Sequence, residues 1–181
     1  MSYLSPIEVA RVWNMRPDVL ATLTRHMALF ELRTGRKTTV PRDGGVRTAA
    51  RQAEIHADSL AVGGGFKPEH RAAAAGSSAH EYGAAYDLHI VGASGFSDPL
   101  YETLARIGEE LGLVAGLHFK SGPPDPFHFE TKETNDVRRR QWAALVGRRL
   151  RRNLLAGALV IGAGVAAYRL WRTFTRRRHA R

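Results

Sequence analysis

The chain has 181 residues, long enough for one domain of ordinary size and an appendage but cramped for two full domains. Hydrophobic residues make up 44% of it and cysteine is absent, which argues against intrinsic disorder and excludes disulfides and thiolate metal sites. The net charge of +10 belongs to one end: residues 1–137 hold 14 basic and 17 acidic residues, a net charge of −3, whereas residues 138–181 hold 13 arginines and no acid. Because the body is mildly acidic, the basic total does not indicate a nucleic-acid-binding domain.

Three helices are predicted in the first 60 residues. Residues 5–8, SPIE, form a capping box with proline at the first helical position, which predicts a short helix over 6–13. A second helix should begin near Pro17, because apolar residues follow at helical spacing, and Gly35 is a natural stop. A third helix is expected over 48–60.

The second half of the body alternates strand-like and helical patterns. Residues 61–78 contain three successive glycines and a proline, which predict a long loop. Side chains alternate between two faces over 85–90 and again over 127–130, as is typical of strands. Between them, residues 97–112 predict a helix opened by a proline and ended by a glycine, with one apolar stripe for the core. We therefore predict an α+β domain over 1–137, with a small antiparallel sheet flanked by helices.

Two polar segments flank the helix expected between the strands. The first, SAHEYGAAYD, occupies residues 78–87, and the second, DPFHFE, occupies residues 125–130. A catalytic zinc site uses three protein ligands drawn from His and Asp and leaves a fourth position to water, because a closed site cannot activate water. A lone histidine or aspartate is usually a surface or capping residue. Together, however, His80, Asp87 and His128 meet the requirement for such a site.

The two segments follow the pattern S-x-H-x-x-G-x-A-x-D and then D-x-x-H-F-E. In this they resemble the zinc metallopeptidases that include VanY-type D,D-carboxypeptidases, phage L-alanyl-D-glutamate endopeptidases and, by fold, the hedgehog signalling domain. Upstream, GVRTAARQ at 45–52 looks like the G-x-R-[ST]-x-x-x-Q segment of that family, and AGLHFK at 115–120 looks like its Gly-Gly-x-Trp-Lys region. The resemblance covers residues 20–131. It implies a hedgehog-like fold and hydrolysis of peptidoglycan stem peptides with one zinc ion per chain.

The resemblance also implies a role for each matching residue. His80, Asp87 and His128 would bind zinc, and Asp125 would be the general base that takes a proton from the attacking water. A carboxylate three residues before a ligand can reach that water without binding the metal, although Asp125 could instead form a turn between its two neighbouring prolines. Arg47 would hold the substrate carbonyl and stabilise the oxyanion, its alternative being a structural salt bridge.

Three further polar residues, Ser78, Gln52 and His118, are candidates for binding substrate or orienting the ligands. Ser78 could equally cap a turn. His118 lies near the last ligand in sequence and could contact the substrate. Glu130 and His89 are weaker candidates for supporting the ligands.

The basic end divides into an arginine-rich segment at 138–153, an apolar segment at 154–171 and a basic tail at 172–181. Residues 154–168 carry no charge, and as a helix these 15 residues extend about 22 Å, short of a hydrocarbon core of about 30 Å. Continuing to Trp171 gives 18 residues with aromatic side chains at the interface. We predict a single C-terminal transmembrane helix over 154–171, the alternative being a buried or surface-lying cationic helix. Arginines flank both ends, so they do not fix its orientation.

No cleavable secretion signal is predicted, because the N-terminal residues lack a charged start followed by an uninterrupted apolar stretch. A compact chain without a signal suits a phage or prophage lysis system, so we expect a membrane-anchored L-alanyl-D-glutamate endopeptidase acting on the cell wall. A D,D-carboxypeptidase that trims terminal D-Ala is an alternative. Another is a zinc-containing wall-binding module without turnover, against which Asp125 and Arg47 count. A nucleic-acid binder acting through the arginines ranks last, and no nucleic-acid partner is expected.

Overall fold

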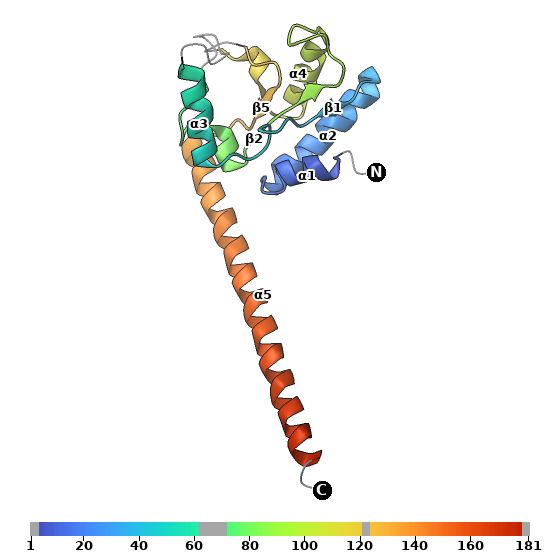
Figure 1. Cartoon of the computed structure of the whole chain (residues 1–181). Helices are drawn as coiled ribbons and strands as arrows, with labels where there is room; N and C mark the ends of the chain where they lie inside the picture. Colours follow the sequence, from blue (N-terminus) through green and yellow to red (C-terminus); the bar gives the residue numbers. More distant parts are fainter. Residues whose placement is uncertain (1–3, 62–71, 121–123, 179–181) are drawn as a thin grey trace. The chain divides into compact units, whose positions relative to one another are not determined.

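The structure is a computed structural model that describes residues 4–61, 72–120 and 124–178, with the side chains of the last helix described as far as Gly157 and at Ala163 (Figure 1). The chain separates into two units, Met1–Trp142 and Ala143–Arg181. The first unit therefore extends past the boundary expected at Val137. Most of the loop predicted over 61–78 lies outside the described residues.

The predicted α+β class is confirmed. The elements in chain order are α1 (Pro6–Val12), α2 (Pro17–Thr34), β1 (Thr38–Thr39), α3 (Ala49–Leu60), the 3-10 turn η2 (Ala79–Tyr82), β2 (Ala85–Asp87), β3 (His89–Ile90), α4 (Leu100–Glu110), β4 (Val114–Ala115), the 3-10 turn η3 (Gly116–His118), β5 (His128–Glu130) and α5 (Asn135–Arg178) (Figure 1). The helices begin and end where local chemistry predicts. Ser5 Oγ accepts from the Glu8 amide at 3.3 Å at the start of α1, and Gly35 ends α2 in the left-handed conformation with φ 69°.

The strands form two small antiparallel sheets. One pairs β1 with β3, and the other has the order β2-β5-β4. The prediction of a single strand over 85–90 is therefore wrong, because this segment divides at Leu88 into two strands that belong to different sheets. The Leu88 amide donates to the Phe127 carbonyl at 2.9 Å, and the Leu88 side chain is fully buried. In the larger sheet Asp87 lies directly opposite His128, which sets the site described below.

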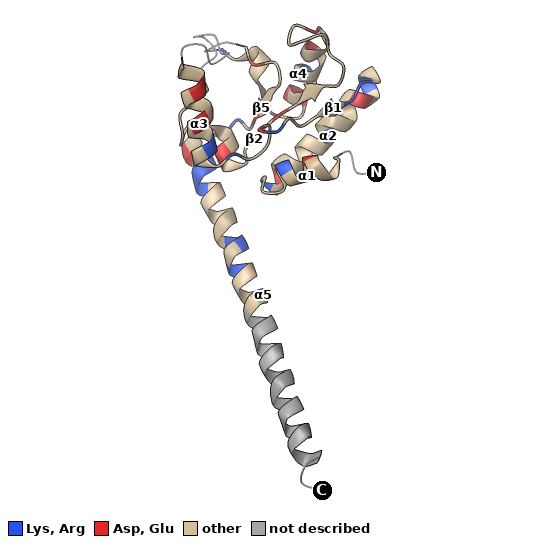
Figure 2. Cartoon of the chain, in the orientation of Figure 1, with Lys and Arg blue, Asp and Glu red and all other residues tan. Residues whose placement is uncertain are grey.

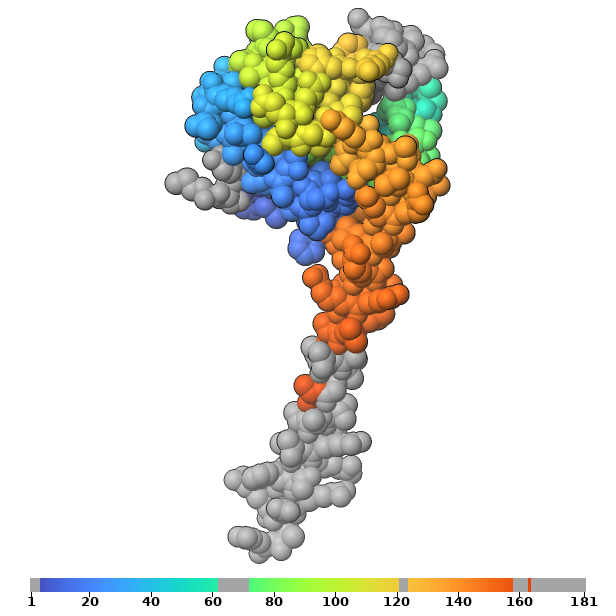
Figure 3. Space-filling model, turned by 180° about the vertical axis from the view of Figure 1, so that it is seen from behind, coloured from blue at the N-terminus to red at the C-terminus, as the bar shows by residue number. Residues whose placement is uncertain are grey.

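The core of the first unit lies between the larger sheet and the helices α2 and α4. From behind, α2 (blue) lies beside α4 (yellow-green) (Figure 3). At the centre, His26 of α2 is fully buried, and its ring lies edge-on to Phe129 with centroids 4.6 Å apart. Its two ring nitrogens lie 3.0 Å from the Tyr86 hydroxyl and 2.9 Å from the Leu104 carbonyl oxygen, joining α2 to β2 and α4.

The buried His26 side chain makes the folded protein less stable as the pH falls. Burial lowers its pKa to about 4, below the value of about 6.5 expected in the unfolded chain. The unfolded state therefore binds the proton first, and stability that is complete above pH 6.5 is lost progressively toward pH 4, by about 3 kcal/mol. We expect His26→Gln, which keeps a donor and an acceptor but does not titrate there, to flatten the unfolding free energy between pH 4 and 6.5. Denaturant unfolding at four pH values measures this, and equal slopes for both proteins would contradict it.

The basic end of the chain is helical through Arg178 as part of α5. Figure 2 shows the described arginines of this helix in blue. Across the described residues, no helix is long and apolar enough to span a bilayer. Most side chains of the predicted transmembrane segment at 154–171 lie outside the described part, and membrane anchoring stays a prediction.

Candidate metal centre

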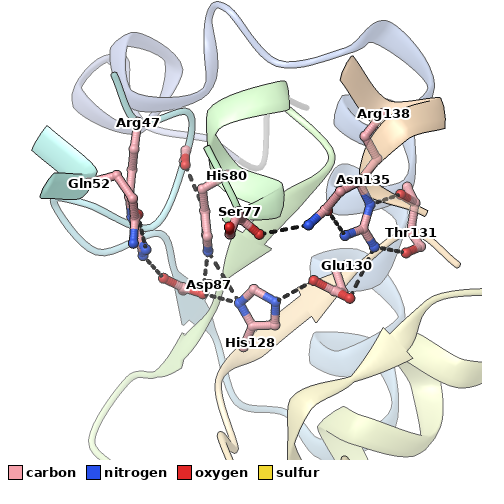
Figure 4. Close-up of polar contacts among 11 residues, drawn as sticks. Arg47, Gln52, Ser77, His80, Asp87, His128, Glu130, Thr131, Asn135 and Arg138 are labelled. Carbon is pink, nitrogen blue, oxygen red and sulfur yellow. Dashed lines mark hydrogen bonds and ion pairs between the residues drawn. The ribbon is translucent and has the colours of Figure 1, made fainter. Parts of the chain in front are cut away.

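Three side chains from distant parts of the sequence converge at one point (Figure 4). His80 of η2, Asp87 of β2 and His128 of β5 each offer one ligand atom, and these atoms all lie within 4.8 Å of one another. His80 Nε2 lies 3.2 Å from Asp87 Oδ1 and 3.2 Å from His128 Nδ1, and His128 Nδ1 lies 3.1 Å from Asp87 Oδ1. The structure thus brings together the three predicted ligands.

Local backbone geometry explains the convergence. β2 pairs with β5 so that Asp87 faces His128 across the ladder. Between η2 and β2 the chain reverses at Gly83, which has φ 58°, a conformation that favours glycine. A Cβ at Gly83 would also lie 2.9 Å from the Trp142 ring and 3.3 Å from the Met15 Cα, so the turn is both left-handed and closely packed. The turn leaves His80 beside the two strand ligands.

The other nitrogen of each imidazole is held by an acceptor, and this fixes which nitrogen keeps a lone pair. His80 Nδ1 donates to the Gly45 carbonyl at 2.8 Å, leaving Nε2 for the centre. His128 Nε2 lies 3.3 Å from Glu130 Oε2 and donates to it, leaving Nδ1 for the centre. Two imidazole nitrogens and a carboxylate oxygen so close together repel one another unless a proton or a metal cation lies between them.

The spacing of the three atoms suits zinc. Zn–N and Zn–O bonds of about 2.0–2.1 Å at tetrahedral angles place ligand atoms about 3.3 Å apart. The observed separations of 3.1–3.2 Å are close to that value. His80, Asp87 and His128 therefore fit a zinc ion with a vertex left over.

The electrostatics of the centre favour positive charge. Burial opposes ionisation of Asp87, yet the charges and hydrogen bonds of both histidines hold the pKa of that carboxyl well below its usual range. Burial also disfavours a charged His128, but its hydrogen bonds to Asp87 and Glu130 outweigh this and raise its pKa to about 10. Burial lowers the pKa of His80. A cation bound here replaces the proton of His128.

Arg47 lies against the centre rather than pointing freely into solvent. Its Nη2 donates to Asp87 Oδ2 at 2.7 Å, its Nη1 to Gln52 Oε1 at 3.3 Å and its Nε to the Asp43 carbonyl at 2.6 Å (Figure 4). Gln52 is buried and donates in turn to the Ala73 carbonyl at 2.7 Å. Gln52 therefore orients Arg47, and Arg47 holds the carboxylate oxygen of Asp87 that lies away from the histidines.

Asp125 is placed by a close approach of two backbone segments. Its amide donates to the Gly116 carbonyl at 2.9 Å, and its own carbonyl accepts from the His128 amide at 3.3 Å. Its Oδ1 is buried, and within the described residues it has no hydrogen-bond partner. Burial and the negative charge of Asp87 raise the pKa of Asp125, against the opposing charge of His128. A carboxylate with one buried oxygen that lacks a partner, and with a raised pKa, is suited to accept a proton.

Gly116 is required for this arrangement. A Cβ there would lie 2.5 Å from the Asp125 carbonyl oxygen and 3.0 Å from the His128 Cβ, so the backbone would have to move. We expect Gly116→Ala to lower the unfolding free energy by about 1–3 kcal/mol and to weaken zinc binding, because both neighbours shift. Gly147→Ala, where a Cβ meets open space, is the matched control. Denaturant unfolding and chelator competition measure the two effects, and zinc affinity equal to that of the control would contradict the prediction.

Known structures share this architecture. The D,D-pentapeptidase VanY from a VanB-type resistance cassette, solved with Zn(II), aligns with a TM-score of 0.53 and 17% identity over 71% of this chain and 78% of its own. DacB from Streptococcus pneumoniae D39 aligns with a TM-score of 0.50 and 15% identity, over 72% and 74%. The LD-carboxypeptidase LdcB gives 0.50 and 18%, over 70% and 71%. The first unit has the VanY fold. No protein-family model matches the sequence, and no curated protein matches it.

Two predicted residues of the VanY-like fold have other partners. Ser78 precedes η2, is buried, and its amide donates to Glu81 Oε2 at 3.2 Å, in keeping with the turn-capping alternative. His118 of η3 lies with Nδ1 2.8 Å from Glu109 and Nε2 3.1 Å from Glu102, and these carboxylates raise its pKa. Both ring nitrogens of His118 are thus engaged on α4, and its contact with substrate remains a prediction.

Two contributors to the candidate metal site were not predicted from the sequence. The Gly45 carbonyl that fixes His80 is a backbone group, which no side-chain pattern shows. Arg138 was assigned to the basic end, yet it is buried and its Nη2 donates to Glu130 Oε1 at 3.0 Å. The sequence signal that could have pointed to Arg138 is Glu130 itself. Glu130 is an acidic residue two positions after the predicted ligand His128, and it needs a cationic partner.

Proposed function

We propose that this protein is a zinc-dependent peptidase that hydrolyses peptidoglycan stem peptides. The observation that carries the proposal is the convergence of two imidazole nitrogens and one carboxylate oxygen at 3.1–3.2 Å, together with Asp125, whose Oδ1 is buried and has no hydrogen-bond partner among the described residues. The VanY-like fold supports it, since one solved relative of that fold holds Zn(II) and another, VanYB, holds D-alanine-D-alanine. A wall-binding module without turnover would not need a carboxylate oxygen that is buried without a hydrogen-bond partner beside its metal.

In this mechanism His80, Asp87 and His128 hold the zinc. When bound, zinc supplies Lewis-acid polarisation and lowers the pKa of water to about 7. Asp125 accepts the proton of the attacking water on its free Oδ1 and returns it to the departing amine. Arg47 neutralises the outer oxygen of Asp87 and keeps that ligand oriented. Contact of Arg47 with the substrate carbonyl, which would stabilise the oxyanion, stays a prediction.

The bond that we favour is the one between L-alanine and D-glutamate. A carboxypeptidase needs a cation free to bind the terminal carboxylate of its substrate. Among the described residues, Arg47 is a cation that acts on both Asp87 and Asp125, and three of its five N–H donors are already engaged by the protein, which leaves it less available to a terminal carboxylate. An endopeptidase has no such need. The second candidate is a carboxypeptidase, which the names of the structural relatives favour, LdcB being an LD-carboxypeptidase.

Digestion of defined substrates tests both levels of the proposal. Purified full-length protein, with zinc measured by elemental analysis, is incubated with peptidoglycan and with a stem tripeptide that lacks D-alanine, and products are identified by mass spectrometry. We expect cleavage after L-alanine in both, loss of cleavage with a chelator and recovery with added zinc. Release of D-alanine alone would select the carboxypeptidase. Zinc binding without any product would leave only the binding module.

We also infer that residues 154–171 attach the enzyme to membrane, as the flanking arginines and uncharged stretch support. Sedimentation of the full chain with anionic vesicles at high salt tests this. Recovery in the pellet at high salt is expected for an inserted segment, whereas release shows surface attachment only. A place in a phage lysis system remains a prediction.

A further inference from the structure

The acceptor of His128 is itself held from the first turns of α5. Glu130 Oε1 accepts from Arg138 Nη2 at 3.0 Å, while Glu130 Oε2 accepts from His128 Nε2 at 3.3 Å (Figure 4). The carboxylate therefore bridges an imidazole that faces the metal centre and a guanidinium from the following helix. Its side chain is 23% exposed, so water competes only partly for it.

Arg138 is built into this position rather than resting on the surface. Its side chain is 7% exposed, its Nη1 donates to Asn135 Oδ1 at 3.0 Å, and its Nη2 also donates to the Thr131 carbonyl. Asn135 Nδ2 donates in turn to the Ser77 carbonyl at 2.9 Å, three residues before His80. A planar guanidinium with several donors can make these contacts together, whereas a lysine ammonium cannot reproduce them.

We propose that Arg138 and Glu130 are positioning residues for the zinc centre, acting through the tautomer and orientation of His128. Glu130 accepts a hydrogen bond from Nε2, so that Nδ1 presents its lone pair to the metal, and Arg138 holds the Glu130 carboxylate in place. The inference rests on the proposed zinc function but makes a separate claim. The helix that begins the basic end of the chain contributes to the metal site.

Chelator competition on the full-length protein tests the claim directly. We expect Glu130→Gln to weaken zinc binding about 10- to 100-fold, the usual effect of removing a partner of a ligating histidine. Arg138→Gln and Arg138→Lys should also weaken zinc binding. The lysine variant should weaken it by at least about 3-fold, because a single ammonium group replaces the forked guanidinium. The matched control is Arg140→Gln, an exposed arginine of the same helix whose Nε donates to the Asp136 carbonyl.

Two measurements separate positioning from a general loss of folding. The unfolding transition of each metal-free variant shows whether it folds, and the visible absorption of the Co²⁺-substituted protein reports the geometry around the ligands. A folded variant with weaker zinc binding and an altered Co²⁺ spectrum supports the inference. Zinc affinity and Co²⁺ spectra equal to those of the Arg140→Gln control overturn it. If the protein without substitutions binds no zinc, that result refutes the proposed zinc-dependent function and not the positioning role alone.

Discussion

Replacement of Asp125 by asparagine is expected to abolish most hydrolysis while leaving the metal in place. The substitution keeps the shape of the side chain and its backbone contacts with Gly116 and His128, but it removes the proton-accepting oxygen. Loss of a positioned general base lowers rates about 10²- to 10⁴-fold. Steady-state cleavage of the stem tripeptide and zinc content by elemental analysis measure the two effects.

The control for this change is Asp58→Asn, an exposed aspartate on α3 that should keep full activity. A fall of less than about 10-fold for Asp125→Asn would assign the proton transfer to another group. Equal loss of zinc and activity would instead make Asp125 a structural residue of the turn. Either outcome removes Asp125 from the proposed role.

The pH dependence of the unchanged enzyme gives the same carboxylate a second test. A general base works only when deprotonated, so activity is present above its pKa and is lost as the pH falls through it. Because burial and the charge of Asp87 raise the pKa of Asp125, the acidic limb should lie above the ordinary aspartate value of about 3.9. The residual activity of Asp125→Asn should lack this limb.

Replacement of His80 by alanine is expected to remove both zinc and hydrolysis. It deletes the Nε2 that lies 3.2 Å from the other two ligand atoms and leaves a two-ligand site. Zinc affinity should fall by more than about 100-fold. That value is the largest loss usual when only a residue that hydrogen-bonds to a metal ligand is replaced. Chelator competition measures the fall, and His118→Ala, whose nitrogens lie against Glu102 and Glu109, should keep its zinc.

Activity that survives in His80→Ala would refute the zinc mechanism. His80 is fully enclosed and donates to the Gly45 carbonyl, so its loss also removes packing. The unfolding transition of both metal-free proteins therefore accompanies the zinc measurement. A folded variant that binds zinc as tightly as the unchanged protein would exclude His80 from the ligand set.

The features that the sequence predicted are local ones. The capping box at Ser5 and the left-handed stop at Gly35 depend on a few neighbouring residues, and both appear as expected. The metal set was accessible because spacing and residue type restrict zinc sites strongly. The division of one expected strand at Leu88 depends on partner strands elsewhere in the chain, which alternation of side chains does not specify.

Long-range ion pairs account for the other differences between the predicted site and the structure. Arg138 resembles the twelve arginines that follow it in sequence, and only the fold brings it to Glu130. Arg47 was expected at the substrate, whereas the structure shows its ion pair with Asp87 at 2.7 Å. An arginine's long side chain reaches partners that its sequence position does not reveal.

The bridge from Arg138 through Glu130 to His128 sets where this chain can be divided. A fusion or truncation placed where acidic residues give way to arginines, at Val137, would discard the guanidinium and leave Glu130 without its cation. A cut after Trp142, at the limit of the first unit, retains it. The part of the chain that holds the metal site thus includes the opening turns of a helix whose composition alone would assign it to the basic end.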